Sequence, residues 1–71
     1  MDGILHGECF GLTRAELITN ATGVAAGYFE VGVDRIRVRL ANETIEHIER
    51  TMNDKTVAIR FAADFQAEVI L

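Results

Sequence analysis

The segment formed by residues 35–40 (RIRVRL) constrains the fold most, because arginine and apolar side chains alternate along it without interruption. Alternation with a period of two places successive side chains on opposite faces of a β-strand. The sequence therefore predicts a strand over residues 35–41, with its isoleucine, valine and leucine facing a core and its arginines on the other face.

The residues before this strand predict its hairpin partner. Residues 25–32 are rich in apolar and aromatic side chains, and a short loop at residues 33–34 aligns them with the arginine strand. In this register the apolar side chains of both strands share one face, and Tyr28 lies opposite Arg39. We therefore expect a β-hairpin over residues 25–41.

A short helix is predicted before this hairpin. Thr13 and Glu16 have the spacing of a capping box, and Leu12 and Leu17 have that of the accompanying hydrophobic staple. Gly23 is a natural helix stop. The prediction is a helix over residues 13–22.

The segment 43–53 has two interpretations. Asn42 is a candidate N-cap, and the apolar residues Ile45, Ile48 and Met52 share one face of a helix. The alternative is a pair of strands that turn at residues 53–54. Ile45 and Ile48 have opposite strand parity, so the spacing favours the helix.

These segments together predict a fold class. The further expected strands are residues 3–10, 55–61 and 65–71, with a loop at residues 62–64. The order is β-α-β-β-α-β with an additional terminal strand, which is similar in topology to the ferredoxin-like order. We expect one α+β domain, residues 1–71, with two short helices on one face of a small ferredoxin-like sheet. The alternative is an all-β small barrel or ring-forming subunit.

Length and composition favour self-association. A domain of 71 residues buries only roughly 60% of its unfolded-chain surface, so its core alone gives marginal stability. Cys9 is the only cysteine, which excludes a disulfide within the chain, and 49% of the residues are hydrophobic. We expect a homo-oligomer. The alternative is a well-packed monomer with a few exposed apolar residues.

The arginine strand is the main candidate for a binding surface. Its arginines would project from one face at intervals of about 7 Å, and guanidinium groups bind carboxylates and phosphates as two-pronged donors. The predicted partner-binding residues are Tyr28, Arg35, Arg37, Arg39 and Arg60. The alternative is an ordinary outer sheet face, on which the arginines form ion pairs with Glu30 and Glu68.

The sequence contains little that indicates catalysis or metal binding. It has no serine and no glycine-rich phosphate loop. His6 and Cys9 fall on opposite faces of a strand, and Glu43 and His47 lie among other charges on the predicted solvated helix face. We therefore expect a protein that is not an enzyme and has neither a cofactor nor a metal site.

The first residues of the sequence and its net charge indicate the expected cellular location and the kind of partner. It lacks the basic and apolar regions of a signal peptide, and no apolar run has the length of a transmembrane helix. One free cysteine suits a reducing compartment, so we expect a cytoplasmic protein. The net charge of −4 disfavours non-specific binding to nucleic acid.

The leading functional hypothesis follows from these points. It is a small non-catalytic interaction protein that self-associates and binds a partner macromolecule, expected to be a protein, as a regulator, inhibitor or accessory subunit. One alternative is a small-molecule sensor with a ligand at a dimer interface. Another is a weak nucleic-acid-binding module that uses the arginine strand.

Overall fold

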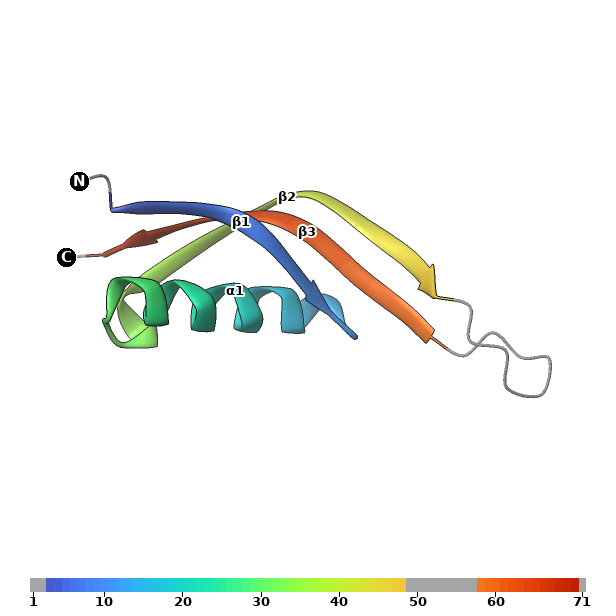
Figure 1. Ribbon diagram of the computed structural model, residues 1–71, viewed down its shortest axis with the longest axis horizontal. Coiled ribbons are helices and arrows are strands. Elements are labelled where there is room, and N and C mark those ends of the chain that lie inside the picture. Colours follow the sequence, from blue (N-terminus) through green and yellow to red (C-terminus); the bar gives the residue numbers. More distant parts are fainter. Residues whose placement is uncertain (1–2, 49–57, 71) are drawn as a thin grey trace.

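The computed structural model describes residues 3–48 and 58–70. In chain order the elements are strand β1 (Ile4–Gly11), helix α1 (Arg14–Phe29), the 3-10 turn η1 (Val33–Arg35), strand β2 (Ile36–Ile48) and strand β3 (Ala58–Val69). The strands form one antiparallel sheet in the order β1-β3-β2. Helix α1 connects the two outer strands and lies against one face of the sheet (Figure 1).

The predicted ferredoxin-like fold is wrong, although the broader α+β class is consistent with the structure. The described residues contain one α-helix and follow a β-α-β-β order. The all-β alternative does not fit either, because α1 occupies 16 residues. The first predicted strand, residues 3–10, is confirmed as β1.

Helix α1 begins where the sequence predicts. Thr13 is the N-cap, its hydroxyl accepts a hydrogen bond from the Glu16 amide at 3.3 Å, and its own amide donates to the Glu16 carboxylate at 3.2 Å. These two bonds satisfy amide groups that would otherwise lack a partner in the first turn. The capping box is therefore present.

The predicted hairpin over residues 25–41 is wrong, because α1 continues past Gly23 to Phe29. Its last turns bury Ala25 and Ala26. This packing against the sheet outweighs the poor helix propensity of glycine. Glu30 is the C-cap of the helix and has a left-handed backbone with a φ of 57°.

The predicted helix over residues 43–53 is wrong in its described part, because residues 43–48 continue strand β2. A β-bulge at Asn42 and Glu43 interrupts the pairing with β3, and Asn42 has a φ of 53°. The extra residue reverses the side-chain parity, which places Ile45 on the same face as Leu40. Residues 49–53 lie outside the described residues.

The loop predicted at residues 62–64 is also wrong, because β3 is one continuous strand at the centre of the sheet. Ala63, Phe65 and Ala67 alternate with more polar residues and are buried on the helix side. Their parity is unbroken along β3, as expected for a strand without a turn. Residues 55–57 and 71 of the two predicted strands lie outside the described residues.

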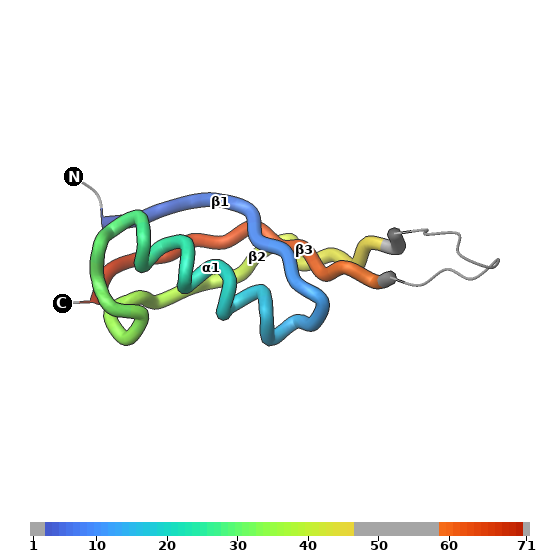
Figure 2. The backbone as a smooth tube through the Cα atoms, turned by 60° about the horizontal axis from the view of Figure 1, so that its bottom comes forward, coloured from blue at the N-terminus to red at the C-terminus, as the bar shows by residue number. Residues whose placement is uncertain are grey.

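Helix α1 lies over the sheet (Figure 2), and the core between them is small. Leu17 is the largest side chain that is fully buried, and several other core residues are alanines. Small side chains allow the helix to lie close to the sheet, but they bury little apolar surface. The core residues are Cys9, Leu17, Ala21, Ala25, Ala26, Ile36, Ala63, Phe65 and Ala67.

Candidate functional site: the outer face of the sheet

The face of the sheet that points away from α1 is arranged in rows, with one residue from each strand. In the order β1, β3, β2, three successive rows are Ile4-Glu68-Arg37, His6-Gln66-Arg39 and Glu8-Asp64-Ala41. Neighbouring rows lie about 7 Å apart by strand geometry. The side chains of a row are cross-strand neighbours and are close enough to bind one ligand together.

Arg37 and Arg39 lie on this face together with Glu68 and Gln66, and these four residues are called the arginine face here. They line a shallow hollow of about 100 Å³. Arg37 forms a salt bridge with Glu68 at 3.3 Å. Within residues 3–48 and 58–70 Arg39 forms no salt bridge, and its neighbour Gln66 is neutral. Arg39 is therefore the guanidinium of this face that no described carboxylate holds in a salt bridge, although Asp64 lines the adjoining hollow.

A second hollow of about 300 Å³ adjoins Arg39. It contains donors from Arg39, Gln66 and His6 and an acceptor from Asp64, while Ala41 is small enough to leave room beside them. Such a set of groups can bind a carboxylate or a phosphate, with the guanidinium as its charged donor.

The other residues predicted for the partner-binding surface lie elsewhere. Arg35 ends the 3-10 turn before the sheet begins. Arg60 lies farther along the outer face, where its Nε donates to Glu46 at 2.9 Å and its guanidinium lies 4.4 Å from the centre of the Phe10 ring. These contacts already occupy Arg60.

Tyr28 is also separated from the arginine face. It lies on α1, on the other side of the sheet from Arg37 and Arg39. There it is exposed, and its ring centroid lies 5.0 Å from that of Phe29 in a T-shaped arrangement. The predicted position of Tyr28 opposite Arg39 followed from the hairpin register and is wrong, because Tyr28 belongs to α1. The structure thus brings together two of the five predicted residues, Arg37 and Arg39.

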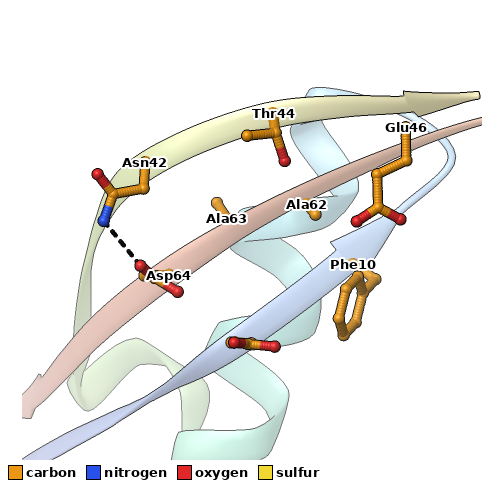
Figure 3. A pocket seen from close by; sticks show the side chains of 8 residues that line it. Phe10, Asn42, Thr44, Glu46, Ala62, Ala63 and Asp64 are labelled. Atoms are coloured by element: carbon orange, nitrogen blue, oxygen red, sulfur yellow. Dashed lines mark hydrogen bonds between the residues drawn. The ribbon is translucent and has the colours of Figure 1, made fainter.

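The outer face also carries an acidic hollow of about 150 Å³ that the sequence did not indicate (Figure 3). The bulge in β2 brings Asn42 to Asp64, and the amide donates to the carboxylate at 2.7 Å. Glu8 and Glu46 also line this hollow. Among the described residues no group of three or more acidic, histidine or cysteine side chains is placed to hold a metal ion. No separate site is assigned to these acids.

His6 and Cys9 point to opposite sides of β1. His6 is exposed on the outer face, whereas Cys9 is buried under α1 with its Sγ 3.5 Å from the Ala63 carbonyl oxygen that accepts its hydrogen bond. Burial raises the pKa of the Cys9 thiol, and the negative charge of Asp64 raises it further. A neutral buried thiol is a poor nucleophile at neutral pH.

Comparisons with known proteins add no family to this description. No protein-family model matches the chain, and neither the curated proteins nor the solved structures contain a significant match. In the described part of the chain, no helix has both the length and the apolar character needed to cross a membrane. The geometry of the outer face is therefore the main indication of what this chain binds.

Proposed function

We propose that this chain is a small non-catalytic interaction protein that self-associates and binds an acidic partner protein through Arg37 and Arg39. In this role it would act as a regulator, inhibitor or accessory subunit. The position of Arg39 supports the proposal best. Its guanidinium lies on a sheet face that α1 does not cover. It also has no salt-bridge partner among residues 3–48 and 58–70.

The chemistry of the arginine face favours a carboxylate as the bound group. A carboxylate accepts two parallel hydrogen bonds from one guanidinium, and the amide of Gln66 offers a further donor in the same row. The Arg37–Glu68 pair is exposed, and exposed pairs contribute only about 0–1 kcal/mol. A partner carboxylate can therefore compete with Glu68 for Arg37.

The charge of the whole chain favours a protein partner over nucleic acid. Affinity for nucleic acid depends mainly on many simultaneous phosphate contacts. The chain has a net charge of −4, and the described part of the outer face also carries Glu8, Glu46 and Asp64. A small basic area within an acidic surface suits a local contact with a few acidic side chains.

A small anionic ligand is the second candidate, because the hollow beside Arg39 has about 300 Å³, the lower limit of typical ligand pockets. This candidate predicts that a small carboxylate or phosphate compound raises the melting temperature of the wild-type protein. The same compound should have no effect on Arg39→Gln. A panel of such compounds without any shift in melting temperature would exclude the candidate.

The proposed partner binding is tested with arginine variants in an affinity-capture assay followed by quantitative mass spectrometry. Reversal of both charges in Arg37→Glu/Arg39→Glu should abolish capture of the partner, while the circular dichroism spectrum stays that of the wild type. Arg39→Gln should weaken capture strongly.

Arg35→Gln is the matched control, because it removes the same charge from the 3-10 turn and leaves the sheet face intact. Capture by this control should stay close to that of the wild type. Equal losses in Arg39→Gln and Arg35→Gln would mean that net charge alone controls binding, which contradicts the proposal. Capture that survives the double charge reversal would also contradict it.

A further inference from the structure

Strand β1 forms one edge of the sheet, because β3 lies between it and β2 (Figure 1). Its sequence contains neither proline nor lysine, and its pairing with β3 runs from Ile4 to Gly11 without a bulge. Proteins commonly use these residues or bulges to protect a sheet edge, whose unpaired backbone groups otherwise bind another strand. Within residues 3–48 and 58–70, no strand pairs with the free side of β1. The edge is therefore open and unprotected there.

Every second residue of β1 directs its backbone N–H and C=O groups to this free edge. The Gly3 carbonyl accepts a hydrogen bond from the Val69 amide at 3.2 Å, so the odd-numbered residues bond to β3 and the even-numbered ones point away from it. The outward residues are Ile4, His6, Glu8 and Phe10. The side-chain amide of Asn20 agrees with this direction, because it donates to the Phe10 carbonyl at 2.6 Å from outside the sheet. Asn20 occupies one carbonyl and leaves the rest of the edge free.

The sequence of β1 is complementary to itself about Gly7. If a two-fold axis at Gly7 pairs β1 antiparallel with β1 of a second copy, His6 of one copy faces Glu8 of the other, and Ile4 faces Phe10. All four are outward residues, so each pair can exchange two backbone hydrogen bonds. An imidazole donor opposite a carboxylate and an aliphatic side chain opposite an aromatic ring are favourable cross-strand pairs. Gly7 faces itself, so no side chains collide at the axis.

Other symmetric pairings lack this complementarity. An axis at His6 places two imidazoles opposite each other, and an axis at Glu8 does the same with two carboxylates. On the other edge of the sheet, an axis at residue 37, 38 or 39 of β2 places arginine opposite arginine, and the bulge interrupts the strand. Like charges directly opposite each other destabilise a strand pair. Of the two edges of the described sheet, β1 is therefore the one that fits a second copy of itself.

We infer that two copies of this chain associate by antiparallel pairing of their β1 strands about a two-fold axis at Gly7. The two three-stranded sheets then join along this edge into one continuous sheet, with both copies of α1 on the same side. The pairing satisfies backbone groups that the single chain leaves open at its edge. The inference rests on the self-association in the proposed function and specifies its contact, and it does not depend on the arginine face.

Native mass of the purified chain is the first test, measured by size-exclusion chromatography with multi-angle light scattering over a dilution series. The wild type should have twice the mass of one chain, which is 7.9 kDa. A monomeric wild type would overturn the inference.

Glu8→Pro tests whether the free edge of β1 is the contact. Proline removes the outward N–H of residue 8 and leaves the hydrogen bonds between β1 and β3 intact, so the edge strand tolerates it. Each dimer loses two backbone hydrogen bonds, and the dissociation constant should rise by about 100-fold or more. The matched control Glu8→Ala keeps the N–H and should raise it less than about 10-fold. Equal dissociation constants for the two variants would overturn the inference.

A charge exchange tests the register without proline and its risk to folding. His6→Glu places two carboxylates opposite each other in both of its cross-strand pairs, and should raise the dissociation constant by about 10-fold. The double variant His6→Glu/Glu8→Lys restores a donor opposite a carboxylate and should return the dissociation constant to within about 3-fold of the wild type. A double variant that dissociates as readily as His6→Glu would contradict the axis at Gly7.

The register can also be read in the wild type by isotope-filtered NMR on a mixture of labelled and unlabelled chains. A nuclear Overhauser effect should connect the methyl groups of Ile4 in one copy with the Phe10 ring in the other. Within one chain these residues lie about 20 Å apart along the strand, too far for such an effect. A dimer without this contact would overturn the inference. Arg37→Glu/Arg39→Glu should keep the dimer mass, so failure of the proposed partner binding is distinguishable from failure of the β1 contact.

Discussion

The ring of Phe65 lies against the backbone of Gly7, its cross-strand neighbour on the helix side of the sheet. A Cβ atom at position 7 would be 2.9 Å from Cε1 of Phe65, closer than side-chain packing allows. Phe65 is buried and has little room to move. Gly7→Ala should therefore lower the free energy of unfolding by about 1–3 kcal/mol, as overpacking does elsewhere, measured by urea denaturation.

The control for this prediction is Gly3→Ala, because no atom lies within 4 Å of a Cβ built at Gly3. Its free energy of unfolding should stay within about 0.5 kcal/mol of the wild type. If Gly7→Ala is as stable as this control, the packing of the Phe65 ring does not require the absence of a side chain at position 7.

Two other glycines predict the opposite effect. Gly23 and Gly27 lie inside α1, have no positive φ, and have open space where a Cβ would be. Alanine loses less backbone entropy than glycine when a helix forms. Gly23→Ala and Gly27→Ala should each raise the free energy of unfolding by about 0.5–1 kcal/mol in urea denaturation, and a loss of stability would contradict the described helix.

The pair formed by Arg14 and Glu43 predicts a pKa change at the surface. The hydrogen bond from Arg14 lowers the pKa of Glu43 below its ordinary value. Because the folded pKa is lower than the unfolded one, the stabilising contribution is present above the unfolded pKa and is lost as the pH falls through the folded pKa. Arg14→Met should raise the pKa of Glu43 towards its ordinary value, as measured by carboxyl ¹³C NMR titration.

The matched control is Arg37→Met, which removes an arginine whose salt bridge is with Glu68 and not with Glu43. It should leave the titration of Glu43 unchanged. If Glu43 titrates alike in the wild type and in Arg14→Met, the ion pair that joins α1 to β2 does not form in solution.

The pKa of the Cys9 thiol tests whether this side chain is buried. Desolvation is the main cause of its raised pKa, and the charge of Asp64 is the second. Because the pKa of Cys9 is higher in the folded protein than in the unfolded chain, the contribution of this thiol to stability is present below the unfolded pKa. It is lost as the pH rises through the folded pKa. Asp64→Asn should therefore lower the pKa of Cys9 only in part, as followed by thiolate absorbance. A full return to the ordinary value would contradict burial as the main cause.

The sequence predicts local features of this fold better than its tertiary arrangement. The capping box at Thr13 and the strand at residues 3–10 depend on neighbouring residues, and both are present. The apolar side of the arginine strand is likewise directed to the core, with Ile36 buried and Val38 and Leu40 packed against it. Signals of this kind require no knowledge of distant contacts.

The errors arise where distant contacts decide the structure. Gly23 resembles a helix stop, but packing of Ala25 and Ala26 on the sheet carries the helix onward. Asn42 resembles an N-cap, but it forms a bulge and donates to Asp64, a residue 22 positions away.

The candidate site was also predictable only where local sequence pattern determines it. Alternation alone indicated that Arg37 and Arg39 share a face, and they do. The positions of Tyr28 and Arg60 depended on strand pairing that the sequence does not encode locally. Gln66 lies beside Arg39 only because β3, rather than residues 25–32, is the neighbour of β2.

The most direct test of the arginine face is an NMR titration with an oligoglutamate peptide, in which the Nε–H signals of the arginines are followed. The account predicts the largest shifts at Arg39 and Arg37. Smaller shifts are expected at Arg14 and Arg60, because each donates two hydrogen bonds to its glutamate, whereas Arg37 donates one to Glu68. An oligolysine peptide should leave Arg39 unchanged. Equal shifts at all arginines, or shifts confined to Arg14 and Arg60, would contradict the account.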